Sequence, residues 1–370
     1  MIRKNKEPLF HLVKRDTLPR HTRLLIRFLA IVLALILCAA ITAFFTGINP
    51  IQVYGSIVSG AFGSTRKTWI TLQDLSVLLL ISLALTPAFT MRFWNIGGEG
   101  QVLVGGLATA ACMICLEGKA PSAVIMLLSF VSAVAAGALW GFIPAICKSK
   151  WNTNETLMTL MMNYIATQIV SFFIIVWEVP KGSGKIGIIN QNSHAGWMPS
   201  LFGSKYMLCI TVSLAVMIFL YIYLKYSKHG YEIQVVGESE NTARYVGIKV
   251  GNVIIRTMLL SGALCGLAGM LLVGSINHTI TTTIAGGQGF TAVMVSWMAK
   301  FNPFTMVLSA FLIIFMKRGA GEIATNFGLN QSFADILTGI ILFFIIGCEF
   351  FINYRIKSGK RHDEKGGSEC

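Results

Sequence analysis

Long apolar runs dominate the chain and define its predicted elements. A helix needs roughly 20 apolar residues to cross a hydrocarbon core of about 30 Å. The predicted spans, in chain order, are Leu24–Gly47, Leu72–Met91, Gln101–Leu116, Ser122–Cys147, Leu157–Trp177, Tyr206–Leu224, Ile254–Ile276, Gly289–Ala299, Pro303–Met316 and Phe333–Tyr354. The last three are shorter or broken. The pattern predicts an all-α integral membrane protein of about ten transmembrane helices.

Two glycine clusters interrupt this pattern. Asn95-Ile96-Gly97-Gly98-Glu99-Gly100-Gln101 stands between two spans with almost no loop between them. Gly286-Gly287-Gln288-Gly289-Phe290-Thr291 lies 189 positions later and repeats the order of two glycines, a polar residue and a glycine. We interpret the clusters as matching broken or re-entrant segments of two pseudo-repeated halves, a feature that marks the substrate path in many transporters. The alternative is that both are tight turns at the membrane surface.

Polar side chains within these segments require partners. A carboxylate at the centre of a membrane helix costs about 2.5–3.5 kcal/mol on insertion scales, so Glu99 should face a cavity, a polar partner or the membrane edge. Asn154 is a predicted N-cap, and Glu155 in the first turn would complement the helix dipole. Asn163 lies inside a span, and its amide requires either another helix or a ligand.

The helices also carry a packing signal. Gly137 and Gly141, and likewise Gly262 and Gly266, are four residues apart. This spacing allows two transmembrane backbones to approach closely. We therefore predict helix packing, rather than chemistry, at these glycines.

Composition agrees with a membrane protein. The chain is 54% hydrophobic and 12% charged, with a mean hydropathy of +0.68, which is too apolar for a soluble globular protein. When the N-terminus is placed in the cytoplasm, 22 of the 30 Lys and Arg residues fall on the cytoplasmic side. This bias follows the positive-inside rule and predicts cytoplasmic termini, with a basic arm at 1–23 and a polar tail at 356–370. The net charge of +14 therefore needs no nucleic acid, and attraction to membrane lipid is sufficient.

Motifs for catalysis or metal binding are missing. The sequence has no GxxxxGK[ST] phosphate loop, no HExxH and no GxSxG. Cys112 and Cys115 form a CxxC pair in an apolar run with no histidine or second pair nearby, so we interpret them as small hydrophobic residues. The spans also lack a relay of acids and histidines beyond Glu99. We expect no catalytic residue, no metal and no cofactor in this chain, and an energy source in another subunit.

The loop 225–252 is the longest predicted cytoplasmic connection between spans. Gly237 and Gly247 bracket a stretch from Glu238 to Val246 that is long enough for about two helical turns. Its mixed charge and small apolar face favour a groove in a protein partner over a lipid surface.

Several motifs together resemble one family. Arg92-Phe93-Trp94-Asn95-Ile96-Gly97-Gly98-Glu99-Gly100-Gln101 is similar to the motif of permease subunits in nucleoside and simple-sugar ABC importers, the branched-chain amino acid/ribose-type permeases. Further similar segments are Gly137 to Pro144, Asn154 to Ala166 and Val236 to Ile248, in the family's order and spacing. The resemblance covers roughly residues 24–355, the expected permease domain.

The resemblance implies a transport subunit in the cytoplasmic membrane of a bacterium. It would pair with a second homologous permease, dock on an ABC ATPase that binds ATP and Mg²⁺, and receive cargo from an extracytoplasmic binding lipoprotein. The implied substrate-path residues are Asn95, Gly97, Gly98, Glu99, Gln101, Asn163, Gln288 and Thr291. The implied ATPase-coupling residues are Gly237, Glu238, Asn241, Ala243, Arg244, Tyr245 and Gly247.

The sequence departs from the family pattern at two places. Trp94 stands where Phe is common, and Thr291-Ala292 stand where many relatives carry Asp-Gly. Nucleoside is the preferred cargo, and ribose or another simple sugar is the alternative. Two further alternatives are an ion-coupled secondary carrier and a membrane enzyme or scaffold that uses Glu99 with Asn95.

Overall fold

The computed structural model describes residues 10–15, 19–47, 49–201 and 203–358. The elements are β1 (Phe10–Lys14), α1 (Arg20–Thr46), α2 (Pro50–Phe62), α3 (Thr65–Thr90), α4 (Gly98–Leu116), α5 (Ser122–Trp151), α6 (Glu155–Trp177), α7 (Met207–Tyr226), α8 (Lys228–Glu238), α9 (Glu240–Tyr245), α10 (Val250–Leu271), the π-helical turn η1 (Leu272–Asn277), α11 (Gln288–Met298), α12 (Pro303–Asn326), α13 (Gln331–Asn353) and β2 (Tyr354–Ser358). The predicted arm 1–23 lies partly, and the predicted tail 356–370 mostly, outside the described residues.

Nine helices in the described ranges are long and apolar enough to cross a membrane. They are α1, α3, α4, α5, α6, α7, α10 with η1, α12 and α13. The predicted all-α membrane fold is confirmed, but the span predicted at Gly289–Ala299 is wrong. That segment is α11, whose 11 residues extend about 17 Å, roughly half of the hydrocarbon thickness. The sequence analysis also missed α2, an apolar helix of 13 residues.

Side-chain caps define where several helices begin. Asn154 Oδ1 accepts a hydrogen bond from Leu157 N at 3.1 Å, which confirms the predicted N-cap of α6. Ser64 caps α3 in the same way, and Ser239 caps α9. Each cap satisfies one of the amide groups that a helix start leaves without an intrahelical partner.

The chain forms two compact units, residues 1–60 with 316–370 and residues 61–315. In the first unit, α1 packs along α13 and β1 pairs antiparallel with β2. Asn326 Nδ2 also donates to Ser56 Oγ at 3.2 Å and joins α12 to α2. The sequence analysis did not predict the strand pair, because the two segments lie at opposite ends of the chain.

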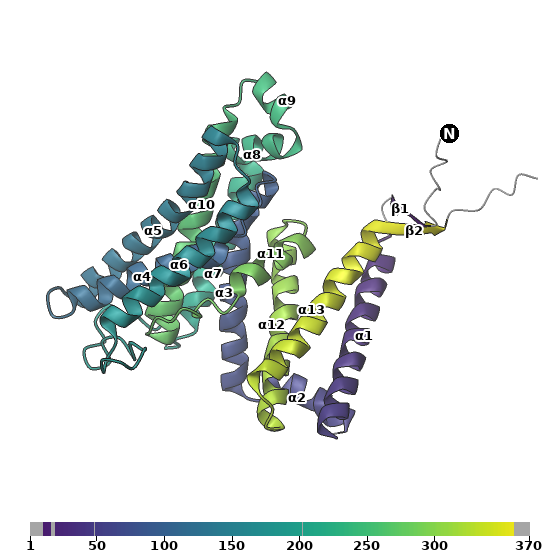
Figure 1. The fold of residues 1–370 in the computed structure, drawn as a ribbon, viewed down its shortest axis with the longest axis horizontal. Coiled ribbons are helices and arrows are strands. Elements are labelled where there is room, and N and C mark those ends of the chain that lie inside the picture. The colour runs from purple at the N-terminus through teal and green to yellow at the C-terminus, as the bar shows by residue number, and fades with distance from the viewer. Residues whose placement is uncertain (1–9, 16–18, 48, 202, 359–370) are drawn as a thin grey trace, which may run out of the picture. The chain divides into compact units, whose positions relative to one another are not determined.

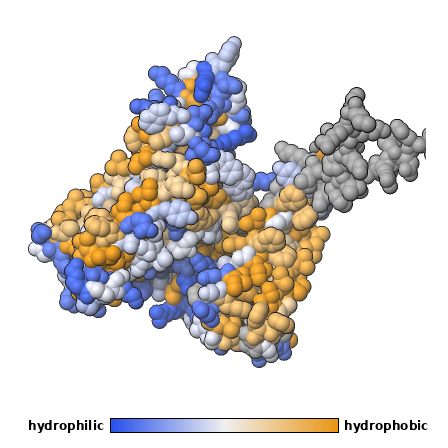
Figure 2. All heavy atoms as spheres, in the orientation of Figure 1, coloured by the Kyte–Doolittle hydropathy of each residue, from blue (hydrophilic) through white to orange (hydrophobic). Residues whose placement is uncertain are grey.

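The second unit is built around α10, which packs on α3, α4 and α5 (Figure 1). Helix α3 is largely enclosed by the other helices, since 83% of its apolar window is buried inside the protein. We call the end that carries α8 and α9 the α9 end, and the opposite end, with residues 178–206, the loop end. Hydrophilic side chains gather over α8 and α9, whereas hydrophobic side chains cover much of the bundle below them (Figure 2).

Glycines at the crossing of α5 and α10 permit this packing. A Cβ atom on Gly137 would collide with the Gly262 carbonyl oxygen, and one on Gly266 would collide with the carbonyl oxygen of Ala133. Gly105 of α4 approaches Gly266 equally closely. A Cβ atom on Gly141 would lie 2.7 Å from the Met258 carbonyl oxygen of α10, so the predicted packing role of Gly137, Gly141, Gly262 and Gly266 is confirmed.

One carboxylate at the loop end binds backbone amides of the loop that follows α6. Glu178 accepts hydrogen bonds from Gly182 N at 2.7 Å and Gly184 N at 2.8 Å. The hydrogen bond from Gly182 N, and next the one from Gly184 N, lower the pKa of Glu178, because they stabilise its ionised form. Nearby, the rings of Trp197 and His278 stack 3.7 Å apart.

Candidate functional site

The first glycine cluster breaks the chain between α3 and α4. Residues 92–97 are not helical, and Arg92 has a left-handed φ of 61°. Asn95 is fully buried here, with Oδ1 accepting from Gly97 N at 3.0 Å and Nδ2 donating to Ser261 Oγ of α10 at 3.1 Å. Gln101 Nε2 donates to Asn95 Oδ1 at 3.4 Å. The predicted break is confirmed, and its amide side chains are bonded inside the protein.

Helix α6 satisfies the backbone of the same break. Asn163 Oδ1 accepts from Gly100 N, and its Nδ2 donates to Ile96 O, each at 2.9 Å. Thr159 Oγ1 accepts from Ile96 N at 3.2 Å. The sequence left another helix or a ligand as the partner of Asn163, and the structure shows a hydrogen bond from another helix, α4, at Gly100. Such bonds are required, because broken backbone is tolerated at membrane depth only where protein or water satisfies it.

The second cluster breaks the chain between η1 and α11. Residues 278–287 are not helical, and α11 begins after Gly287, which has a φ of 72°. Thr291 Oγ1 donates to Gly287 O at 3.0 Å. The buried Gln288 Oε1 accepts no hydrogen bond from the described residues. Helix α4 packs on α10 and α11 packs on α3, so the helix before each break adjoins the helix that follows the other break.

Glu99 joins the two breaks. Its Oε1 accepts from Gly287 N at 2.9 Å, and its Oε2 accepts from Gly289 N at 2.7 Å. Glu99 also lies in the first turn of α4, so the amino ends of two helices meet at one carboxylate. Helix amino ends carry partial positive charge and favour an anion. The polar partner expected for Glu99 is therefore the backbone of the second cluster.

Close approach at this junction requires glycine. A Cβ atom on Gly289 would collide with the backbone of Glu99, and one on Gly100 would lie 2.8 Å from Asn163 Oδ1. Gly97 and Gly98 are buried beside the same break. The structure thus brings Asn95, Gly97, Gln101 and Asn163 together at the first break, and Glu99 joins this break to Gly287 and Gly289, which flank Gln288. A role of these residues and of Thr291 in contacting cargo stays a prediction.

The predicted coupling segment forms two helices rather than one. Gly237 and Glu238 end α8, Ser239 caps α9, and α9 itself covers only Glu240–Tyr245. Gly237 is buried against Thr90 O, where a side chain would collide. The single helix expected from Glu238 to Val246 is therefore not formed. Its first residue ends α8, and the Ser239 cap then begins the shorter helix α9.

Most of the predicted ATPase-coupling residues on and directly after α9 are exposed at the surface. Tyr245 is 94% exposed, and Arg244 contacts Glu240 Oε2 at 3.4 Å in a largely exposed pair. Asn241 and Gly247 are exposed as well, Gly247 with a φ of 83°. An aromatic ring this exposed at the end of a charged helix is typical of a surface covered by a partner.

Ala243 connects α9 to the first break. It is fully buried in a cluster that includes Met91, Phe93, Val236 and Ile254. Met91 and Phe93 directly precede Trp94 and Asn95 in the broken segment. The packed side chains therefore form a continuous physical connection from α9 to the break.

An ion pair fixes α8 to α10. Arg256 Nη2 lies 2.8 Å from Glu232 Oε2, and His229 Nδ1 lies 3.8 Å from the same oxygen. The hydrogen bond from Arg256 lowers the pKa of Glu232 and keeps it ionised. Sequence reasoning missed Glu232, Arg256, Thr159 and Ser261. Thr159 could have been identified from the sequence, because it lies in a predicted span four residues before Asn163.

The comparisons with known proteins agree on one family. The sequence profile described as "Branched-chain amino acid transport system / permease component" matches residues 69–346. The guanosine ABC transporter permease protein NupP of Bacillus subtilis is 30% identical over 330 residues, covering 88% of this chain and 94% of that protein. The nucleoside ABC transporter permease protein NupB of Lactococcus lactis is 27% identical over 347 residues, covering 91% and 94%.

A sugar permease is also similar. The glucose ABC transporter permease protein TsgB13 of Haloferax volcanii is 25% identical over 350 residues, covering 90% of each chain. The matched profile spans most of this chain, and the similarity to NupP extends nearly from end to end. This chain therefore belongs to the branched-chain amino acid transport system / permease component family.

Proposed function

We propose that this chain is the permease subunit of an ATP-driven importer that carries a nucleoside across the cytoplasmic membrane. The observation that carries the proposal is the junction at Glu99, where two broken helices meet inside a bundle of membrane spans. Discontinuous helices with their amino ends at a common site are typical of the substrate path in transporters.

The cargo follows from the relatives. Two of the similar proteins are named as guanosine and nucleoside permeases and one as a glucose permease. Nucleoside is therefore the first candidate, and ribose or another simple sugar is the second. Family membership supports a transport subunit rather than an enzyme.

The proposed partners are a second permease, an ABC ATPase and an extracytoplasmic binding lipoprotein. NupP and NupQ are both named as guanosine permease proteins of Bacillus subtilis, which supports a pair of permeases. The ATPase would bind ATP and Mg²⁺ and would receive α9. We place the α9 end in the cytoplasm, because Lys148, Lys150, Lys225 and Lys228 gather there.

Coupling would run through the cluster around Ala243. Closure of the ATPase would displace α9, and the packed side chains of Met91 and Phe93 would transmit that displacement to the broken segment. Rearrangement of the break would then alternate access to the path. Glu232 and Arg256 would keep α8 aligned with α10 during this movement.

Reversing the charge of Arg244 should uncouple transport. We expect Arg244→Glu to reduce ATP-driven uptake at least tenfold, because it places a second carboxylate beside Glu240 on the surface that meets the ATPase. Membrane abundance should be unchanged, since the Arg244 side chain is 66% exposed. Uptake and ATP hydrolysis are measured together in proteoliposomes that hold the complete transporter.

The matched control is Lys150→Glu, which reverses an exposed charge in the last turn of α5. Its uptake should stay within about twofold of the unmodified protein. Normal uptake by Arg244→Glu would remove α9 from the coupling mechanism.

Uptake assays in cells with and without this chain test the cargo. We expect loss of the chain to abolish uptake of labelled guanosine and uridine while ribose and glucose uptake are retained. Loss of sugar uptake alone would show that the cargo is a sugar rather than a nucleoside. Uptake that follows an ion gradient and persists without the ATPase would instead indicate a secondary carrier.

A further inference from the structure

Four aromatic side chains form a closed set of contacts between α3, the first break and α11. Trp94 of the break stacks on Trp297 of α11, with ring centroids 5.1 Å apart. Trp297 contacts Phe301, in the turn after α11, at 5.7 Å, and Phe301 stacks on Phe89 of α3 at 6.2 Å. Phe89 also contacts Trp94 at 6.2 Å, which closes the set. We call these four residues the aromatic quartet.

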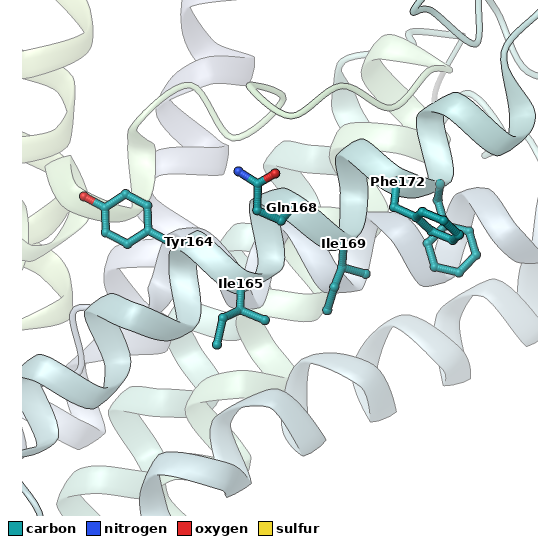
Figure 3. Close-up of a pocket in the computed structure, with 6 residues that line it drawn as sticks. Tyr164, Ile165, Gln168, Ile169 and Phe172 are labelled. Atoms are coloured by element: carbon teal, nitrogen blue, oxygen red, sulfur yellow. The ribbon is translucent and has the colours of Figure 1, made fainter.

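The quartet joins separate parts of the chain. Exposed aromatic side chains of α6, such as Tyr164 and Phe172, project from one helix (Figure 3). Each ring of the quartet instead contacts a ring from another segment. Stacked and edge-to-face pairs attract each other beyond the burial of their area. A tryptophan that only anchors a helix at the membrane interface needs no such partners.

Trp94 adjoins the cluster that contains Ala243 of α9. Its neighbour Phe93 is 3% exposed and packs in that cluster. Trp94 itself is 40% exposed and lies against Trp297 of α11. Two consecutive residues of one short segment therefore pack with the α9 cluster and with α11. A displacement of this segment would act on both.

The turn after α11 has an unusual backbone. Lys300 has a φ of 51° and Phe301 a φ of 60°, in the left-handed region that bulky side chains rarely adopt. Such conformations persist where the surrounding structure holds them, and they concentrate at functional sites and switch regions. The two ring contacts of Phe301 and a hydrogen bond from Phe301 N to Ser296 O at 3.0 Å hold this turn. Opening of the quartet would allow the turn to relax.

Helix α11 is attached along its whole length. At its amino end, Gly289 N donates to Glu99 Oε2 at 2.7 Å. In its second half, Ser296 Oγ donates to Ser82 O of α3 at 3.0 Å. The quartet holds its carboxyl end. A movement of that end would therefore be carried by a helix of 11 residues to the Glu99 junction.

We propose that the aromatic quartet transmits the displacement of α9 to α11, with Trp94 and Trp297 as positioning residues. The proposal rests on the proposed function, in which an ATPase displaces α9. It adds a second target to the first break, because α11 follows the second break and bonds to Glu99. Contact alone does not demonstrate coupling, so the test asks whether the two tryptophans act as one unit.

The test measures guanosine uptake and ATP hydrolysis together in proteoliposomes that hold the complete transporter and its binding protein. Trp94→Ala and Trp297→Ala should each lower the guanosine transported per ATP hydrolysed about tenfold. The double variant should be no worse than either single variant, because each one removes the whole contact. Trp94→Phe retains a ring and should stay within about threefold.

The matched control is Trp69→Ala. It removes a ring of the same helix, α3, that stacks on Tyr206 at 6.2 Å away from both breaks. Its transport per ATP should stay within about twofold of the unmodified protein. Where Trp94→Ala fails to accumulate in the membrane, Trp94→Leu retains apolar volume without a ring and should give the same tenfold loss.

Hydrogen exchange supplies a readout that a loss of stability alone would not produce. Trapping the ATPase with ADP and vanadate should change amide exchange in both α9 and α11 of the unmodified transporter. In Trp94→Ala the change in α9 should remain, and the change in α11 should be at least threefold smaller.

Three results would overturn the proposal. The first is that both alanine variants transport as much guanosine per ATP as Trp69→Ala does. The second is a double variant with the product of the two single losses, about a hundredfold, which would show that the tryptophans act separately. The third is an unchanged response of α11 in Trp94→Ala. Each of these results leaves the proposed function standing, whereas an unmodified transporter that takes up no nucleoside would overturn both.

Discussion

Replacing Glu99 with leucine is expected to reduce ATP-driven uptake more than a hundredfold. The carboxylate accepts the amide hydrogens of Gly287 and Gly289, and leucine leaves both donors without a partner. Each unsatisfied buried donor costs about 1–3 kcal/mol, so the junction between the breaks should come apart. Uptake in proteoliposomes and the melting temperature of the purified protein are the measurements.

Two further variants test whether the lost hydrogen bonds cause the loss of uptake. Glu99→Gln should be intermediate, because its amide oxygen can accept one hydrogen bond while its NH₂ group opposes the second donor. Leu127→Ala changes an exposed apolar side chain on α5 and should leave uptake within about twofold. If Glu99→Leu transported as well as Leu127→Ala, the carboxylate would have no part in organising the two breaks.

Replacing Gly266 with valine should have the largest effect on folding. The added side chain would collide with the Ala133 carbonyl oxygen and crowd the backbone of α5 at Gly137. Overpacking usually costs about 1–3 kcal/mol, and collision with the backbone of a neighbouring helix, which cannot move aside as a side chain can, should exceed this range. We expect the amount of folded protein in the membrane to fall at least fivefold, as measured by size-exclusion chromatography of a fluorescent fusion.

The control is Gly339→Ala on α13. A Cβ atom at that position has no atom within 4 Å, so the substitution should be neutral or stabilising by about 0.5–1 kcal/mol. Normal amounts of the Gly266→Val protein would mean that α4, α5 and α10 can separate without loss of the fold.

Local patterns in the sequence were enough to predict much of the fold. The apolar runs predicted the membrane helices, the spacing of Gly137 and Gly141 predicted a packing surface, and Asn154 predicted a helix start. Each of these signals lies within a few residues of the feature that it specifies. The two breaks were predictable for the same reason, because glycines and a carboxylate interrupt apolar runs there.

Features that depend on distant residues were not predictable. The hydrogen bonds of Glu99 to Gly287 and Gly289 depend on tertiary packing between segments about 190 residues apart. The apolar composition of α11 does not distinguish a re-entrant helix from a full span. Only its length of 11 residues in the structure shows that it is too short to cross the membrane. For Asn163, the sequence left another helix or a ligand open as the partner, and the hydrogen bonds with Gly100 N and Ile96 O depend on tertiary packing that the sequence does not show.

The Glu99 junction has a consequence for biosynthesis. Its partner Gly289 is separated from it by 190 positions, and ribosomes add about 5–20 residues per second. The carboxylate therefore waits about 10–40 s in the nascent chain before its partner is made. During that interval the amino-terminal half must be held in the membrane with a polar group that has not reached its final partner. Until then Glu99 lacks both of the amide donors that hold its carboxylate in the finished protein.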